Sequence, residues 1–437
     1  MKRYRFLFAI LLILLFSLSA CESLPFDIPW LVPDRPTLTQ QPGDPVDETP
    51  TPALTDAVEP TPEEITSLTL WVPPELDPES ESSAAQLFTD QLQRYSELND
   101  NLTINVRVKA ASGAGGLLDA LTATSPAAPD ALPDLIALSR EDLEAAALKG
   151  LIFSMDGLTD IVDNADWYGY AREMALIQGS VFGLPFAGDA LALVYRPESL
   201  AEIPASWEDL IASEVVLAFP AQSDQALFQL SLYEGEGGAV QDNQRRPVLE
   251  LDPLTTVFHF IEDGVTEGLF VETTTQYQTI TQVWAAFRDG QTNLAVVWVS
   301  DYLQDDAADA ALRPLLPMAG GAASMGTGMS WALASPNPER QEMAADLAEF
   351  LVEPEFLVDL TYALGYLPTR SSALEGWEDQ NLRGTVSQIA LMTRLRPSND
   401  ILSTLGPIIQ TQTQQILQSL INPAQAAQAA LESLEDQ

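Results

Sequence analysis

The segment from Gly179 to Pro197, near the middle of the chain, predicts two strands with a sharp bend between them. Val181 to Leu184 and Ala190 to Tyr195 have the apolar character of short strands, and Pro185 to Gly188 separates them. Proline lacks a backbone donor and glycine adopts dihedral angles that other residues avoid, so strands are interrupted at such residues. We therefore predict that the chain crosses here from one lobe to another.

The residue pattern on either side of this crossing alternates between strands and helices. Before it, strands are predicted at 67–72, 102–108 and 133–138, with helices from about 82 and at 117–122 and 142–149. After it, strands are predicted at 215–219, 293–299 and 330–334, with helices at 224–233, 253–263, 280–289, 338–350 and 354–364. Such alternation calls for parallel sheets covered by helices, with ligand contacts at the carboxyl ends of the strands. A chain of 437 residues also exceeds what one core usually fills, which favours two lobes.

The N-terminus has the pattern of a secretory signal over residues 1–20. Basic residues precede an apolar run from Phe6 to Phe16, and small residues precede Cys21. The run is shorter than the roughly 20 residues that a membrane-spanning helix needs. Leu18 to Cys21 resembles the bacterial lipobox, which implies cleavage before Cys21 and a diacylglycerol on its sulfur. The alternative is an ordinary signal peptide with a leftover thiol.

Residues 21–66 are rich in proline, threonine and acids, so we expect an extended, semi-rigid tether and no packed core there. The chain has a formal net charge of −43, and removal of the signal would delete only basic charges. A field of this sign repels phosphate backbones, which argues against nucleic-acid binding. We interpret the acids as a solvated surface; adaptation to a salty or acidic habitat is the alternative.

Four segments indicate a family by their content and their order. They are Pro133 to Ile152, Phe182 to Leu210, Phe287 to Tyr302, and Gly328 to Pro368. Together they resemble the extracellular solute-binding proteins of bacterial ABC importers, in particular the maltose-binding-like sugar group. The Pro-Ala-Ser-Trp-Glu-Asp motif at 204–209 and the Gly-Leu-Pro motif at 183–185 are similar to that group's hinge region.

The resemblance implies an α/β, two-lobed periplasmic-binding-protein type II fold, in which each lobe is a mostly parallel sheet flanked by helices. Lobe 1 would comprise 67–187 and about 329–375, and lobe 2 would comprise 188–328 and about 376–437. It also implies a monomeric binding protein without cofactor or metal that captures a sugar and delivers it to the permease subunits of an ABC transporter. The Cys21 lipid would hold the protein at the outer face of the bacterial cell membrane.

Two segments depart from the family pattern. The family's strand after Gly290 usually leads into an asparagine, glycine, small residue, tryptophan turn, whereas this chain has Val299 to Tyr302. Residues 398–405 contain no aromatic, although the family often supplies one there. We therefore expect a small sugar in preference to a long oligosaccharide.

Sugar recognition needs flat aromatic faces for C–H surfaces and polar groups for hydroxyls. By position in the family's motifs, the predicted ligand-binding residues are Trp71, Ser139, Arg140, Asp142, Phe186, Asp189, Trp298, Ser300, Tyr302 and Trp331. Core packing is the alternative for Trp71, Trp298 and Trp331. Asp142 could instead be a helix N-terminal acid, and Asp189 a turn residue.

Two other functions stay open at this stage. With 63 acids, a catalytic carboxylate pair cannot be dismissed by counting, so a surface glycoside hydrolase or lyase is one alternative. The other is a ligand-sensing lipoprotein that binds a non-sugar solute. The lone His259 lies between two phenylalanines and does not suggest a base, and the sequence shows no catalytic triad, metal cluster or phosphate loop. We interpret the glycine-rich segment Ser112 to Gly116 as a turn whose amides contact ligand.

Overall fold

The computed structural model describes residues 65–100, 102–200, 204–305 and 309–436. The predicted signal, Cys21 and nearly all of the predicted tether lie outside the described residues. Within the described ranges, no helix has the length and apolar character that a membrane span requires.

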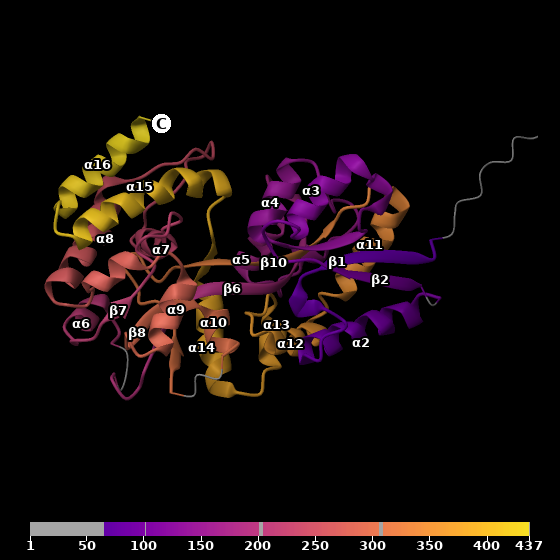
Figure 1. Ribbon diagram of the computed structural model, residues 1–437, viewed down its shortest axis with the longest axis horizontal. Coiled ribbons are helices and arrows are strands. Elements are labelled where there is room, and N and C mark those ends of the chain that lie inside the picture. Colours follow the sequence, from indigo (N-terminus) through magenta and orange to yellow (C-terminus); the bar gives the residue numbers. More distant parts are fainter. Residues whose placement is uncertain (1–64, 101, 201–203, 306–308, 437) are drawn as a thin grey trace, which may run out of the picture. The chain divides into compact units, whose positions relative to one another are not determined.

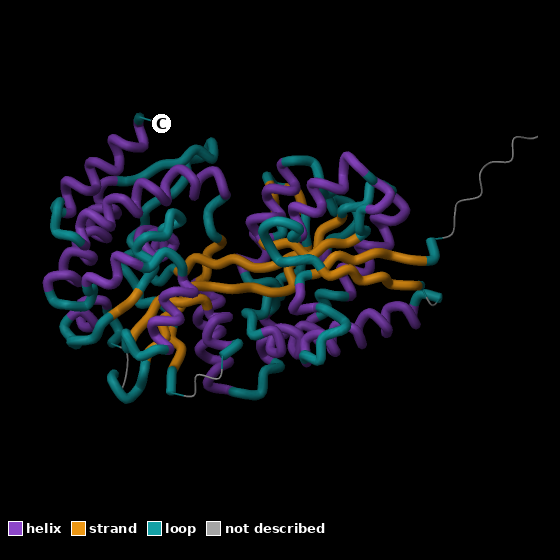
Figure 2. The backbone as a smooth tube through the Cα atoms, viewed as in Figure 1, coloured by secondary structure: helices purple, strands orange, loops and turns teal. Residues whose placement is uncertain are grey.

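One 9-stranded mixed sheet runs through the molecule in the order β2-β1-β3-β10-β6-β8-β7, with β11 paired to β10 and β9 paired to β6 (Figures 1 and 2). Its strands are β1 (Ser67–Val72), β2 (Thr103–Val108), β3 (Leu135–Ser139), β6 (Leu184–Tyr195), β7 (Leu217–Ala218), β8 (Leu294–Trp298), β9 (Ala311–Arg313), β10 (Ser324–Leu333) and β11 (Thr393–Leu395). A separate hairpin consists of β4 (Leu176–Ile177) and β5 (Ser180–Val181).

Helices cover both faces of the sheet (Figure 1). They are α2 (Ser83–Leu98), α3 (Leu117–Ala127), α4 (Arg140–Leu148), α5 (Gly169–Met174), α6 (Trp207–Ile211), α7 (Leu227–Gly235), α8 (Leu251–Thr266), α9 (Ile280–Arg288), α10 (Val299–Leu303), α11 (Pro338–Phe350), α12 (Pro354–Leu364), α13 (Ser371–Glu375), α14 (Gln380–Met392), α15 (Asn399–Leu417) and α16 (Pro423–Glu435). Short 3-10 turns occupy 74–76, 129–131, 161–163 and 272–276. Ser206 and Asn337 cap α6 and α11, because each side chain accepts a backbone bond from the first turn of its helix.

β6 is one continuous strand of 12 residues, so the predicted break at 185–188 is wrong. A bulge replaces the break, because β10 pairs Met329 with Ala187 and then Ser330 with Pro185, which passes over Phe186. A bulge leaves ladder positions unpaired, so the missing donor of Pro185 is tolerated there. Packing requires a glycine at position 188, since a Cβ there would overlap the hydroxyl of Tyr170.

β6 and β10 are shared by two halves of the sheet. The β6 strand pairs with β10 as far as Ala190 and with β8 from Leu191 onward. The β10 strand pairs with β3 only from Met329 onward. We call the half with β1, β2 and β3 lobe 1 and the half with β7, β8 and β9 lobe 2. The boundaries predicted at 187–188 and about 328–329 fall on this shared segment.

The hydrophobic core is continuous between the lobes on one face of the sheet only. On that face, one cluster includes Phe88 and Trp331 of lobe 1 together with Val297 and Phe287 of lobe 2. On the other face, lobe 1 has its own small cluster under α3 and α4, and lobe 2 has another under α7, α8 and α15. The second face is therefore the one on which the lobes are packed separately.

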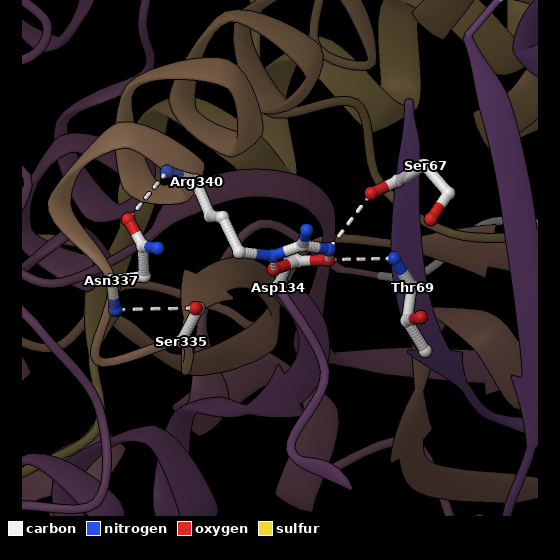
Figure 3. Close-up of polar contacts among 6 residues, drawn as sticks. All are labelled: Ser67, Thr69, Asp134, Ser335, Asn337 and Arg340. Atoms are coloured by element: carbon white, nitrogen blue, oxygen red, sulfur yellow. Dashed lines mark hydrogen bonds and ion pairs between the residues drawn. The ribbon is translucent and has the colours of Figure 1, made fainter. Parts of the chain in front are cut away.

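A buried ion pair attaches α11 to the outer end of the lobe 1 sheet (Figure 3). The guanidinium of Arg340 donates to both oxygens of Asp134 at 2.6 Å and to the carbonyl of Ser67 at 2.8 Å. Asp134 is 2% exposed and also accepts from the backbone N–H of Thr69 at 2.7 Å. This bidentate, fully bonded geometry is the kind in which a buried pair offsets its desolvation cost.

We expect Arg340→Met to lower the free energy of unfolding by about 3–5 kcal/mol, because it leaves the Asp134 carboxylate buried without its charged partner. Urea denaturation measures the change. The matched control is Arg172→Met, whose pair with Asp163 is exposed on both sides and should contribute less than about 1 kcal/mol. If both variants lost the same unfolding free energy, the Arg340–Asp134 pair would be no more stabilising than an exposed ion pair.

Candidate ligand-binding site

The carboxyl ends of the parallel strands in the two lobes point toward each other across the shared segment. β6 and β10 are antiparallel, and β7 and β8 run opposite to β1, β2 and β3. β3 ends beside Met329, which pairs with Ala187, and β8 ends beside Leu191. Along β6, Ala187 and Leu191 are separated by roughly 13 Å at the rise of an extended strand. Side chains at these two strand ends are thus within reach of one small ligand.

A cavity of about 250 Å³ lies between α3 and α4, the helices that follow the carboxyl ends of β2 and β3. Its lining comes from the turn after β2 and from α3 and α4: Ser112, Gly113, Gly116, Leu118, Asp119, Thr122, Asp142 and Lys149. Gly113 and Gly115 have φ of 77° and 75°, which residues with a Cβ adopt rarely, so glycine is needed for this turn. Asp119 holds the turn by accepting from the N–H of Gly115 at 2.8 Å.

A second cavity of about 260 Å³ lies at the carboxyl end of the lobe 2 strands. Its lining combines the partly buried indole of Trp298 with short polar side chains and amides: Ser223, Asp224, Gln225, Gln278, Thr279 and Thr281. An aromatic face beside several amide and hydroxyl groups suits a ligand with C–H surfaces and many hydroxyls. The sequence interpretation included Trp298 but missed these polar residues. The polar run that follows the strand predicted at 215–219 is the signal that could have identified the first three.

Asp189 and Ser300, both predicted site residues, are bonded to each other in the interior. Asp189 is 5% exposed, and its carboxylate accepts from the backbone N–H of Ser300 at 3.1 Å and from the Ser300 hydroxyl. Burial raises the pKa of Asp189 to about 7, although these hydrogen bonds oppose the shift, and the nearby Asp301 adds to it. Since Ser300 lies in the first turn of α10, the pair attaches this helix to the crossing strand.

Phe186 and Trp331 lie in the core. Trp331 is 0% exposed, with ring centroids 4.8 Å from Phe186 and 5.8 Å from Phe88. Neither side chain offers a surface to a ligand, which agrees with the core-packing alternative for Trp331. Tyr302 packs against the continuous core, on the face opposite to Trp298, and its hydroxyl donates to the carbonyl of Ala310 at 3.4 Å.

The remaining predicted residues lie at the lobe 1 strand ends. Ser139 caps α4 by accepting from the N–H of Asp142 at 3.1 Å. Burial raises the pKa of Asp142, and Glu141 adds to the shift, so Asp142 combines a first-turn position with a place in the lobe 1 cavity. Trp71 is 3% exposed, with the Lys109 ammonium 4.9 Å from its ring centroid. Arg140 is buried, and its Nε and Nη1 have no hydrogen-bond partner in the described structure.

Comparisons with known proteins give the same architecture. The family model of the bacterial extracellular solute-binding proteins matches residues 90–383. A search of curated proteins finds no significant match. A cyclo/maltodextrin-binding protein complexed with maltotetraose has a similar structure, with TM-score 0.70, 17% identity and coverage of 85% of this chain and 97% of that chain.

Two further solved structures are similar over the same share of the chain. The sugar-binding protein MalE from Xanthomonas citri has TM-score 0.69 and 17% identity, with 85% of this chain and 97% of that chain covered. The GacH receptor of Streptomyces glaucescens has TM-score 0.63 and 18% identity, with the same coverage of 85% and 97%. At such identities the likeness shows the fold, and it confirms the predicted two-lobed α/β class.

The pH dependence of stability tests the Asp189 environment. A carboxyl group whose pKa is raised from 3.8 to about 7 in the folded protein keeps a proton that the unfolded chain has lost between these values. The unfolding free energy should therefore fall as pH rises through this window. We expect Asp189→Asn to gain stability relative to the wild type from about pH 4 to about pH 7, measured by urea denaturation. If the unfolding free energies of the wild type and Asp189→Asn changed with pH in parallel, the pKa of Asp189 would not be raised in the folded protein.

Proposed function

Because this chain belongs to the bacterial extracellular solute-binding proteins, we propose that it captures a sugar between its lobes and delivers it to the permease of an ABC importer. The observation that supports a sugar is the lobe 2 cavity, where the Trp298 indole lies among amide and hydroxyl side chains. The family consists of binding proteins, so we propose no chemical step on the ligand.

The two cavities would contribute opposite halves of one site. Each lies at the carboxyl ends of the parallel strands in its lobe, and the two strand ends are roughly 13 Å apart along β6. A ligand that contacts both lobes stabilises the conformation in which they are close, which is the usual hinge response of such proteins. From the predicted residues we propose Trp298, Asp142 and Arg140 as ligand contacts, with Asp189 and Ser300 holding α10 on the hinge strand.

We propose a ligand of one or two sugar rings. The cavities have volumes of about 250 and 260 Å³, so the two halves together lie in the lower part of the range of roughly 300–1,000 Å³ typical of small-molecule sites. The start of α15 also lacks an aromatic to extend the site, and Asn399 instead bonds to α4 of lobe 1. Both features favour a compact ligand.

Isothermal titration against a panel of mono- and disaccharides tests the proposal. We expect Trp298→Ala to weaken binding of a sugar from that panel roughly 10- to 100-fold, because the aromatic face is lost. Tyr362→Ala is the control, since this aromatic is 58% exposed on α12, and its affinity should be unchanged. Failure of the wild type to bind any sugar, or equal affinity of Trp298→Ala, would refute sugar capture in this cavity.

Export of the protein and its attachment to the membrane form a separate proposal. We propose that the chain is held at the outer face of the cell membrane through a lipid on Cys21, as the lipobox resemblance implies. The wild type should partition into the detergent phase of a Triton X-114 extract, whereas Cys21→Ser should remain in the aqueous phase. Detergent partitioning of both proteins would exclude Cys21 as the attachment point.

A further inference from the structure

Arg140 is a buried cation with nitrogens that lack hydrogen-bond partners among the described residues. It is the first residue of α4, directly after the carboxyl end of β3, and it is 8% exposed. Its Nε and Nη1 make no hydrogen bond in the described part of the chain. Buried guanidinium groups are normally paired and bonded, because an unpartnered buried charge costs free energy. Arg340, in contrast, donates hydrogen bonds to Asp134 and Ser67. The difference indicates that a hydrogen-bond acceptor belongs beside Arg140.

A second buried arginine lies close to it. Arg396, between β11 and α15, is 7% exposed, and its Nε also lacks a partner. Its Nη1 pairs with Glu141 at 3.0 Å, and its Nη2 donates to Asn399 at 3.3 Å. Burial is the main cause that lowers the pKa of Arg140, and the charge of Arg396 lowers it further. The two guanidinium groups are therefore near enough for their charges to repel.

The acids around this pair accept hydrogen bonds from donors other than Arg140. Glu141 is bonded to Arg396, and Glu144 accepts from the backbone N–H of Asn399 at 3.1 and 3.2 Å. Asp400 accepts from the Ser398 hydroxyl. Asp142 lines the lobe 1 cavity. Glu144 attracts Arg140 electrostatically, but no hydrogen bond or ion pair joins the two side chains in the described structure.

We propose that the bound sugar is acidic, and that its carboxylate is held between Arg140 and Arg396. This proposal rests on the proposed function and narrows its ligand class. A carboxylate accepts charge-assisted hydrogen bonds from a guanidinium, and these are stronger than the bonds that a neutral hydroxyl accepts. Its two oxygens would bridge the arginines, one accepting from an unpartnered nitrogen of Arg140, Nε or Nη1, and the other from Nε of Arg396.

Matched sugar pairs test the proposal by isothermal titration on the mature chain. D-galacturonate and D-glucuronate are compared with D-galactose and D-glucose, which have a hydroxymethyl group in place of the carboxylate. We expect at least one uronate to bind about 100-fold more tightly than its neutral counterpart, since the charge-assisted bonds of its carboxylate to the two arginines are the difference between them. Succinate and citrate serve as carboxylates without a sugar ring.

Two variants assign the effect to Arg140. Arg140→Gln should lose about 100-fold in affinity for the preferred uronate, and the loss for the neutral counterpart should be at least tenfold smaller. Arg172→Gln, an exposed arginine of lobe 1 paired with Asp163, should match the wild type in every measurement.

The outcomes separate this proposal from the broader function. Tight binding of neutral sugars without preference for uronates would overturn the acidic ligand and leave sugar capture standing. Binding of succinate or citrate but of no sugar would overturn both, as would no binding at all. A loss of stability in Arg140→Gln, with equal losses for acidic and neutral sugars, would show that Arg140 has only a structural role.

Discussion

The two adjacent strands β6 and β10 determine the arrangement of the rest of the molecule. Because both belong to the sheets of both lobes, they set how far apart the other parallel strands end. Packing around the shared segment is dense, since Gly188 lies under Tyr170 and Gly328 under Met174 with no room for a Cβ. A ligand that touches both strand ends must therefore lie on the face where the lobe cores are separate.

Much of this arrangement could be predicted from local pattern, and the exceptions have tertiary causes. The strands and helices around the crossing follow from their periodicity. The expected break at 185–188 does not occur because Thr369 donates to the Pro185 carbonyl and Leu367 exchanges two backbone bonds with Gly188. These partners lie about 180 residues further along the chain, so they cannot be predicted from the sequence of the segment itself.

The candidate site was less predictable, because the position of a residue in a family motif does not indicate whether its side chain is buried. Trp331 occupies a position that resembles a ligand platform, yet its ring lies between Phe186 and Phe88. Asp189 and Ser300 were both anticipated, but not that they bond to each other. The amides around Trp298 come from loops whose approach depends on how α7 and α9 pack, and sequence spacing contains no information on that approach.

The buried arginines connect the stability of the protein with its proposed closure. Arg340 satisfies Asp134 and holds lobe 1 together, whereas α4, which begins with Arg140, is bonded through Glu141 to Arg396 and to Asn399 at the start of α15. If the lobes separate on this face, we expect these bonds to break and water to solvate Arg140. Closure without ligand then buries a charge that lacks an acceptor, whereas closure with a carboxylate supplies one. A ligand can shift a conformational equilibrium only by its difference in affinity for the two states, and Arg140 is positioned to generate that difference.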